Sequence, residues 1–251
     1  MGENGFIGRH IFESCGHSGI FVIPLERWDG NPKNLERQLH HIKTANPQSQ
    51  IILVQAAWYS TSNRDYRIAP QNNIWVKTTL TIIELCKKNK IIFVGLGSCL
   101  EKLNSTDDIY ARSKIKILNY LTQESSFVDW IWFQIHYVYS RDLLKPEVVR
   151  KAAAAKKSGE KLELMTPNST HDFIEVRDAA NAIVHSISHE HRGKIEIGTG
   201  KLFSVSYLLH SLFPEVEILE QNSTVAGISY EQPASIEILV DSGWKPKYSL
   251  T

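Results

Sequence analysis

The first half of the chain alternates between short apolar runs and segments with helical periodicity. The apolar runs are rich in β-branched residues and hold almost no charge, which is typical of strands buried on both faces of a sheet. The predicted strands are Ile20–Leu25, Gln50–Val54, Lys90–Gly95 and Trp130–Val138, and the predicted helices are Gly8–Cys15, Asn34–Thr44, Asn73–Lys88 and Ala111–Leu121. Because strands that alternate with helices pair in parallel, the sequence predicts an α/β fold with a doubly wound parallel sheet.

The pattern is less regular after Ser140. The second half is predicted to contain helices at Pro146–Lys157 and Ala179–Ile187 and short strands at Asp172–Val176 and Lys194–Ile197. No low-complexity linker interrupts the sequence. We therefore predict one main domain over residues 1–140, to which residues 172–200 return, and a small additional region over residues 141–251.

Composition excludes several classes of protein. The 251 residues include 28 Lys and Arg against 27 Asp and Glu, so there is no basic excess for binding nucleic acid or an anionic membrane. Apolar runs such as Ile51–Val54 are too short to span a bilayer, and the N-terminus lacks a signal-peptide pattern. Three widely spaced cysteines and the loop histidines His189 and His191 lack the spacing of a ligand set, so we predict no metal. We expect a cytoplasmic globular protein.

Three glycines open the first predicted helix. Gly2, Gly5 and Gly8 have the spacing G-x-x-G-x-x-G, with Phe6 and Ile7 between the last two. In a dinucleotide site such glycines allow a tight turn, bring backbone N–H groups close to a pyrophosphate, and let the helix pack closely on the sheet. The same spacing also occurs in ordinary turns. Since helix and strand patterns follow, we predict that residues 2–8 bind a dinucleotide.

The end of the next predicted strand bears on which dinucleotide is bound. Glu26 lies 18 residues after Gly8, where a carboxylate accepts hydrogen bonds from an adenosine ribose and repels a 2′-phosphate. Arg27 favours the opposite choice, because a guanidinium can pair with that phosphate. A solvated Glu–Arg pair without function is the alternative for both residues. We predict NAD as the cofactor, with NADP as the alternative.

A tyrosine and a lysine are placed for proton transfer. Tyr110 and Lys114 lie one helical turn apart on the same face of a predicted helix. A nearby ammonium stabilises phenolate, so we expect a lowered tyrosine pKa and a general acid or base near neutrality. Ser98 ends a parallel strand, where ligands bind, and its hydroxyl can hydrogen-bond the reacting oxygen. A Tyr-x-x-x-Lys/Arg pair occurs roughly once by chance in a chain of this size, so coincidence is the alternative.

The ordered set of motifs resembles a known family. Gly2–Gly8, Ala56-Ala57, Ser98 and the Tyr110/Lys114 pair are similar to an extended short-chain dehydrogenase/reductase, and more narrowly to the NAD-dependent epimerase/dehydratase family that acts on nucleotide sugars. Further segments that resemble the family are 171–180 (HDFIEVRDAA), 193–200 (GKIEIGTG) and 243–246 (GWKP). The resemblance thus covers nearly the whole chain and implies a Rossmann-like fold with a small C-terminal substrate-binding region.

The resemblance implies a mechanism. Tyr110 would remove a sugar hydroxyl proton while hydride passes to the nicotinamide, Lys114 would bind the nicotinamide ribose, and Ser98 would polarise the reacting oxygen. Ala56 and Ala57 would contact the cofactor. An epimerase returns the hydride to the other face of the sugar, whereas a reductase or dehydrogenase stops after one transfer. The resemblance also suggests a role in polysaccharide biosynthesis and a homodimer formed through the helices at 73–88 and 111–121.

Several positions differ from the family pattern. His171 stands where the family usually carries an arginine that binds the pyrophosphate, and Gln134 and Tyr137 stand in a strand that usually carries arginine and asparagine. We predict that these three residues and Trp58 contact the substrate. The altered positions also motivate an alternative, a catalytically degenerate member that binds a nucleotide or a protein partner without turnover. Cys99-Leu100 replaces the Asp-Glu pair of dehydratases, so we rank dehydration below epimerisation or reduction.

Only Met1 precedes the glycines, although the family implies an apolar strand directly before them, at the centre of the sheet. Loss of a central strand would leave both neighbouring strands without ladder partners. We therefore predict that Met1 is a strand-end residue of a longer natural chain, or else that this chain is a destabilised fragment.

Overall fold

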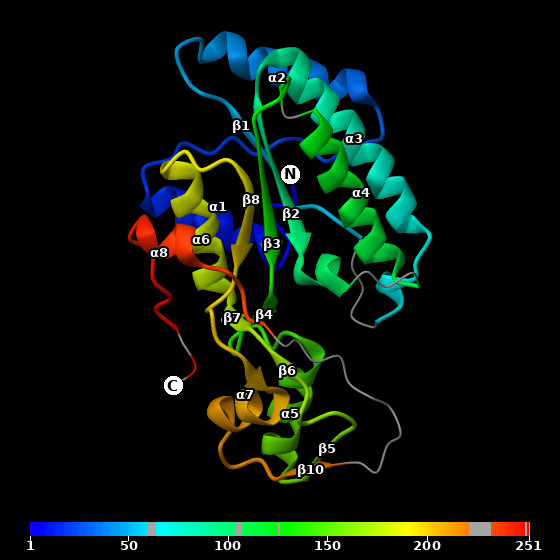
Figure 1. The fold of residues 1–251 in the computed structure, drawn as a ribbon, viewed down its shortest axis with the longest axis vertical. Helices are drawn as coiled ribbons and strands as arrows, with labels where there is room; N and C mark the ends of the chain where they lie inside the picture. Colours follow the sequence, from blue (N-terminus) through cyan, green and yellow to red (C-terminus); the bar gives the residue numbers. More distant parts are fainter. Residues whose placement is uncertain (60–63, 104–106, 125, 221–231, 249, 251) are drawn as a thin grey trace. The chain divides into compact units, whose positions relative to one another are not determined.

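The computed structural model describes residues 1–59, 64–103, 107–124, 126–220, 232–248 and 250 (Figure 1). The chain forms two compact units. The first unit contains Met1–Gln134 and Ser186–Ile195, and the second unit contains Ile135–His185 and Glu196–Thr251.

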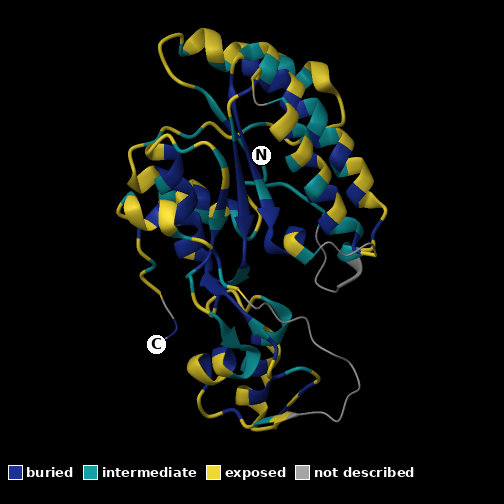
Figure 2. Cartoon of the chain, in the orientation of Figure 1, coloured by how far each residue is buried: buried dark blue, intermediate teal, exposed yellow. Residues whose placement is uncertain are grey.

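A four-stranded sheet forms the centre of the first unit. Its strands lie in the order β1 (Ile52–Gln55), β2 (Ile92–Ser98), β3 (Trp130–Ile135) and β8 (Gly193–Ile197). β1 and β2 are parallel, with Ile52 opposite Ile92. The side chains of β2 and β3 are almost all buried, as Figure 2 shows in dark blue. The prediction of a parallel sheet built from these apolar runs is confirmed.

The predicted strand Trp130–Val138 is wrong as a single element, because the backbone changes its hydrogen-bond partners near residue 136. β3 ends at Ile135, and the next residues form β4 (Tyr137–Tyr139). The His136 N–H donates to the Ile197 carbonyl, whereas the Tyr137 N–H donates to the Asp172 carbonyl. The continuous apolar pattern therefore covers two strands with different neighbours.

Helices cover the sheet of the first unit. They are α1 (Gly8–His17), α2 (Pro32–Ala45), α3 (Gln71–Asn89) and α4 (Ile109–Gln123), with short 3-10 turns η1 (Arg64–Arg67) and η2 (Cys99–Leu103). α3 and α4 lie side by side on one side of the strands (Figure 1). The core between them includes Ile82, Ile83, Phe93, Ile117 and Trp132.

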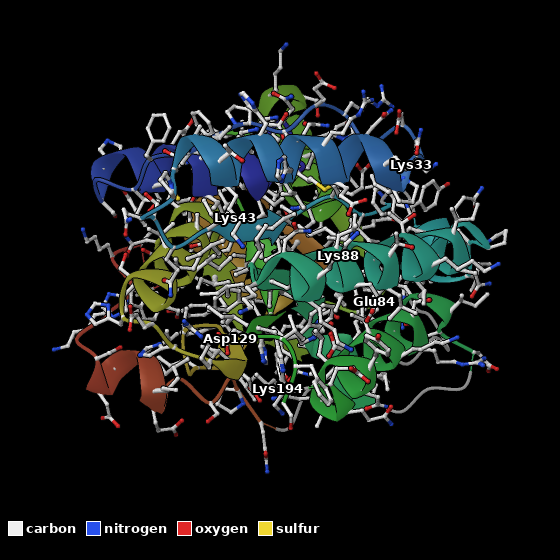
Figure 3. The ribbon with its side chains drawn as sticks, turned by 90° about the horizontal axis from the view of Figure 1, so that it is seen from above. Lys33, Lys43, Glu84, Lys88, Asp129 and Lys194 are labelled. Atoms are coloured by element: carbon white, nitrogen blue, oxygen red, sulfur yellow. The ribbon has the colours of Figure 1, made fainter. Side chains whose placement is uncertain are left out.

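Side-chain caps and ion pairs fix the ends of these helices. The Asn31 side chain accepts a hydrogen bond from the Lys33 N–H at the start of α2, and Asp108 accepts one from the Ala111 N–H at the start of α4. At the other end of α3, Lys88 pairs with Glu36 of α2 (Figure 3 labels the lysine). The Asp108 cap fixes where α4 begins and therefore where Tyr110 lies.

The predicted strand Ile20–Leu25 is not formed, and this prediction is wrong. Residues 20–25 have no regular secondary structure, and Phe21 is 84% exposed. The apolar pattern is that of a strand, but a strand also requires a backbone partner to accept and donate ladder hydrogen bonds. No β-ladder partner pairs with residues 20–25 among the residues that the structure describes.

Met1 lies beside β1 in the manner of a parallel strand. Its N-terminal nitrogen donates to the Val54 carbonyl at 2.9 Å, and its carbonyl accepts from the Ala56 N–H at 2.9 Å. Next to it, a cavity of about 540 Å³ is lined largely by apolar side chains of α1, β1 and residues 20–25. β1 is an edge strand of the described sheet, so the backbone N–H and C=O groups on its outer side face the cavity.

In its described residues, the second unit contains short paired strands and several helices. The paired strands are β4 with β7 (Phe173–Glu175), β5 (Leu162–Leu164) with β10 (Ile218–Glu220), and β6 (Thr170–His171) with β9 (Phe203–Ser204). The helices are α5 (Glu147–Ser158), α6 (Val176–Ser188), α7 (Val205–Leu212) and α8 (Glu237–Asp241). The predicted strand Asp172–Val176 is thus one residue shorter at each end, since α6 already begins at Val176.

Asp172 joins several segments of the second unit. Its carboxylate is fully buried and accepts hydrogen bonds from the backbone N–H groups of Thr199, Gly200 and Ala234. A carboxylate that satisfies three backbone donors fixes their geometry. None of the helices within the described part of the chain is long and apolar enough to cross a membrane.

Candidate functional site

The glycine turn packs directly on the end of β1. Gly2 has φ +89°, a left-handed conformation that favours glycine, and its carbonyl accepts a hydrogen bond from the Gly5 N–H at 2.9 Å. A Cβ at Gly2 would lie 2.5 Å from the Ala57 nitrogen. The turn and Ala56-Ala57 are therefore in contact, as expected for residues that are predicted to bind one cofactor.

The turn leads into α1 without a capping side chain. Ile7 occupies the N-cap position and makes no side-chain hydrogen bond. The N–H groups of Arg9 and His10 donate to the carbonyls of Gly5 and Ile7, so the unpaired donor end of α1 is at its very start. Gly8 is buried, and Phe6 and Ile7 are partly buried. This arrangement suits an anion such as a pyrophosphate. Glu26 and Arg27 are exposed in the segment without regular structure, and their role in choosing NAD or NADP stays a prediction.

Ser98, Tyr110 and Lys114 come together at the carboxyl end of β2. Ser98 is the last residue of β2, while Tyr110 and Lys114 project from the first two turns of α4. A hydrogen bond joins the side chains of Ser98 and Tyr110, and the Lys114 Nζ lies 5.5 Å from the centre of the Tyr110 ring. All three residues thus lie where the spacing predicts them, at the end of β2 and the start of α4, and their chemical roles stay predictions.

Burial shifts the pKa values of this cluster. Desolvation lowers the pKa of Lys114 to about 7, while the charge of Glu101 opposes that change. Burial also raises the pKa of Tyr110, with further contributions from Tyr66 and Glu101, and the Ser98 hydrogen bond only partly offsets this. The expected lowering of the tyrosine pKa is therefore wrong for this structure, because desolvation by burial is the largest cause acting on the phenol. Tyr110 keeps its proton at neutral pH.

Trp58 covers the ammonium of Lys114. The Lys114 Nζ lies 3.5 Å from the centre of the Trp58 ring and donates a hydrogen bond to the Leu96 carbonyl at 2.7 Å. The Trp58 indole N–H in turn donates to the Asn72 side chain at 2.8 Å, which fixes the ring. Trp58 was predicted to contact the substrate, and the structure places it on the catalytic candidate Lys114. Asn72 was not singled out from the sequence, because its partner lies 14 residues away.

Glu101 is a buried acid at the same strand end that the motif analysis missed. It lies in η2, three residues after Ser98, and is 5% exposed. Its carboxylate accepts hydrogen bonds from the Ser98 N–H at 2.6 Å, the Gln134 side-chain amide at 2.8 Å and the Trp132 indole N–H at 3.1 Å. The only sequence signal for this residue is an acid placed directly after an apolar strand end.

The remaining predicted substrate residues lie in both units. Gln134 is buried in the first unit and bonds to Glu101. Tyr137 and His171 lie together in the second unit, with ring centres 4.0 Å apart and planes inclined by 32°. The ring of Phe173 packs at 5.5 Å against the His171 ring. The rings of Tyr137 and His171 therefore lie against one another, and His171 is only 6% exposed.

Solved structures similar to this chain share its fold. UDP-glucose 4-epimerase of Thermus thermophilus, in complex with NAD, is 17% identical with a TM-score of 0.72, over 99% of this chain and 93% of that one. RMD from Pseudomonas aeruginosa, complexed with NADPH, is 18% identical with a TM-score of 0.77, over 100% of this chain and 93% of that one. At these identities the likeness shows the fold alone, which is Rossmann-like.

A third neighbour carries a nucleotide sugar. UDP-N-acetylglucosamine 4-epimerase from Methanobrevibacter ruminantium, in complex with UDP-N-acetylmuramic acid, is 19% identical with a TM-score of 0.72, over 96% of this chain and 90% of that one. No curated protein sequence matches the chain.

The sequence pattern of one family covers most of the chain. The match extends over residues 1–198, from the glycine turn through the cluster of Ser98, Tyr110 and Lys114 to β8. This range also holds the strands and helices that bring those residues together. The chain belongs to the NAD dependent epimerase/dehydratase family.

Proposed function

We propose that this chain binds NAD, or alternatively NADP, and acts on a nucleotide-activated sugar as an epimerase or as a reductase/dehydrogenase. The observation that carries the proposal is the cluster of Ser98, Tyr110 and Lys114 at the carboxyl end of β2. The carboxyl end of a parallel strand is where α/β folds bind ligands. The family membership supports the same reaction class.

The residues present fit a dinucleotide. The glycines of the turn carry no side chain that would block a pyrophosphate, and the Arg9 guanidinium lies beside the turn, where it donates to the carbonyls of Asn4 and Gly5. The contact between Gly2 and Ala57 brings the turn next to the end of β1, as a cofactor that spans both would need. When bound, the nicotinamide ring supplies or accepts a hydride.

Each side chain of the cluster has a separate proposed role in proton transfer. Tyr110 keeps its proton at neutral pH, so it is available to donate to a carbonyl oxygen of a keto-sugar. Ser98 hydrogen-bonds Tyr110 and would orient the same oxygen. The Lys114 ammonium, when protonated, stabilises negative charge near the tyrosine oxygen.

A nucleotide sugar is the substrate class that we propose. The neighbours from Thermus thermophilus and Methanobrevibacter ruminantium are named as epimerases of UDP-sugars. In this chain we assign Gln134, Tyr137, His171 and Trp58 to substrate contacts. His171 lacks the fixed charge and fork geometry of an arginine, so we expect weaker recognition of a diphosphate than an arginine would give. The homodimer through α3 and α4, the cytoplasmic location and the role in polysaccharide biosynthesis stay predictions.

One observation favours a second function, binding without turnover. Burial raises the pKa of Tyr110, so its phenol is a weaker acid and its phenolate a scarcer base than those of an ordinary tyrosine. The Lys114 ammonium already contacts Trp58 and the Leu96 carbonyl. A chain with such a closed cluster could bind a nucleotide or a partner and leave it unchanged.

Cofactor binding is the first experiment. Because Trp58 lies against Lys114, titration with NADH or NADPH should quench tryptophan fluorescence and show which cofactor binds more tightly. Saturable quenching supports an intact dinucleotide site. Absence of quenching, together with absence of binding by calorimetry, would overturn the enzyme proposal.

Turnover is tested with a screen of nucleotide sugars and mass detection of the products. With a nucleotide sugar that reacts, Tyr110→Phe should abolish hydride transfer, while the affinity for the cofactor stays within about twofold of the wild-type value. The matched control is Tyr120→Phe, which removes a hydroxyl from the same helix, where it bonds to Glu84 at the surface. Equal activity of wild type and Tyr110→Phe would remove Tyr110 from the mechanism. Cofactor binding without any product would favour the second function.

A further inference from the structure

Glu101 places a carboxylate inside the proposed active site, where the chemistry described so far assigns it no role. A methyl group at Gly97 would clash with both the Glu101 carboxylate and the Trp132 indole nitrogen. Glycine at position 97 therefore makes room for the acid against the backbone of β2. The carboxylate satisfies donors from two neighbouring strands, the Ser98 N–H at the end of β2 and two side chains of β3.

The hydrogen bond to Glu101 fixes the orientation of the Gln134 amide. The ionised Glu101 carboxylate can only accept, so the NH₂ group of Gln134 faces it and the amide oxygen points away from it. Burial raises the pKa of Glu101, whereas the hydrogen bonds from Gln134, Ser98 and Trp132 and the charge of Lys114 oppose this rise and favour the ionised form. That oxygen is buried and has no hydrogen-bond partner among the described residues. Gln134 itself is 3% exposed. A buried acceptor without a donor is costly in a folded protein and is explained when a ligand supplies the donor.

Glu101 also interacts electrostatically with the proposed catalytic pair. Its negative charge raises the pKa of Lys114 against the effect of burial and raises the pKa of Tyr110 as well. The other titratable groups that influence Tyr110 are Tyr66 of η1 and Cys99 of η2. The Asp108 carboxylate at the start of α4 is neutralised by Arg67. Glu101 is thus the carboxylate that interacts with both members of the pair.

We propose that Glu101 is a positioning residue of this site: it fixes the turn that carries Ser98 and orients Gln134 so that the amide oxygen accepts a hydrogen bond from a hydroxyl or N–H of the substrate. Its charge also opposes the loss of the Lys114 proton that burial favours. For its substrate the inference rests on the proposed function, whereas the hydrogen bonds and the charge effect are independent of turnover.

Glu101→Gln is the informative substitution. The new amide has the size of the acid and can still accept from the Ser98 N–H, but its own NH₂ group would face the NH₂ group of Gln134. The Gln134 amide must then turn over and present a donor instead of an acceptor. We expect KM for the sugar nucleotide to rise about tenfold, because the hydroxyl or N–H donor of the substrate then faces the NH₂ donor of Gln134 instead of its oxygen. The affinity for the cofactor alone should be unchanged.

The pH dependence separates positioning from a purely structural role. Without the negative charge at position 101, Lys114 loses its proton at lower pH. The alkaline limb of the pH profile for kcat/KM should shift by about one pH unit toward acid in Glu101→Gln. The double exchange Glu101→Gln with Gln134→Glu restores one acid and one amide in contact, so it should recover KM toward the wild-type value. Glu163→Gln, an exposed acid on β5, is the matched control.

The outcomes distinguish this inference from the proposed function. A turning-over enzyme in which Glu101→Gln leaves both KM and the pH profile unchanged would overturn the inference alone. In a chain without turnover, an NMR titration of the Lys114 side chain still applies, and we expect its pKa to fall in Glu101→Gln. An unchanged Lys114 titration in that case would overturn the inference as well. Near-UV circular dichroism checks that each variant is folded.

Discussion

The glycine turn yields a sharp test, because two glycines of the same helix have opposite surroundings. At Gly8 a Cβ would lie 2.8 Å from the carbonyl carbon of Gly2 and closer still to its oxygen. Ordinary contacts of this kind are 3.4 Å or longer. At Gly16, near the other end of α1, nothing lies within 4 Å of the position that a Cβ would take. Gly8→Ala and Gly16→Ala therefore form a matched pair.

The magnitudes follow from what each methyl group meets. At Gly8 the neighbour is backbone rather than the end of a flexible side chain, so the turn or the helix must move by more than half an ångström. Overpacking of this kind costs about 1–3 kcal/mol, and rigid neighbours favour the upper end of that range. At Gly16 the methyl group meets only open space, and alanine is favoured over glycine within a helix by about 0.5–1 kcal/mol. The two variants should thus differ by about 3–4 kcal/mol in free energy of unfolding.

Urea denaturation followed by tryptophan fluorescence measures this difference, and NADH titration adds a functional measurement. Gly8→Ala should unfold at lower urea than wild type and lose cofactor affinity, because the displaced turn no longer presents its N–H groups to the pyrophosphate. Gly16→Ala should unfold at slightly higher urea and bind the cofactor as wild type does. Equal midpoints for Gly8→Ala and Gly16→Ala would refute the packing argument. Normal cofactor affinity in Gly8→Ala would show that the turn is not part of the cofactor site.

Three further predictions concern stability. Asp172→Asn should lower the free energy of unfolding by about 3 kcal/mol, because an amide cannot accept from all three backbone N–H donors. Urea denaturation measures this loss, and an unchanged midpoint would contradict the role given to the Asp172 carboxylate. Burial lowers the pKa of Lys114 to about 7, so above pH 7 the unfolded chain binds more protons than the folded chain. The free energy of unfolding should therefore rise with pH toward 10 in the wild type, and Lys114→Met should lose that rise. Parallel curves of unfolding free energy against pH for the two proteins would contradict this prediction. A five-residue apolar extension before Met1 should raise the urea midpoint more than a Gly-Ser extension of equal length. The apolar extension would pair with the outer edge of β1, fill the adjacent cavity and remove the buried N-terminal ammonium, whose pKa burial lowers. Equal midpoints for the two extensions would contradict this prediction.

The catalytic candidates could be predicted from the sequence because their positions depend on local geometry. Tyr110 and Lys114 are four residues apart on α4, and that spacing alone puts them on one face of a helix. Ser98 ends an apolar run, and parallel strands present their carboxyl ends to the same edge of the sheet. Neither inference needs to know which distant residue packs nearby.

Glu101 and the pKa of Tyr110 could not be predicted in this way, because both depend on contacts across the fold. The partners of Glu101 on β3 lie 31 and 33 residues further along the chain. Lys114 was expected to lower the pKa of Tyr110, yet the pKa rises because burial removes water from the phenol, and burial is a property of the packed protein. Spacing identifies which groups are close, while the surrounding protein decides which of their charged forms is stable.

The failed strand at residues 20–25 shows the same limit for the backbone. Ile20–Leu25 has the composition of a buried strand, yet Phe21 and Ile23 are exposed and the segment has no ladder partner among the described residues. Strand propensity expresses how well a side chain fits a pleated, half-buried surface, and it needs a neighbouring strand to have any effect. Met1 meets this condition, since its backbone bonds to Val54 and Ala56 although a single residue has no pattern at all. Pairing with a partner therefore decides which apolar segments of this chain become strands, and composition decides only which segments can.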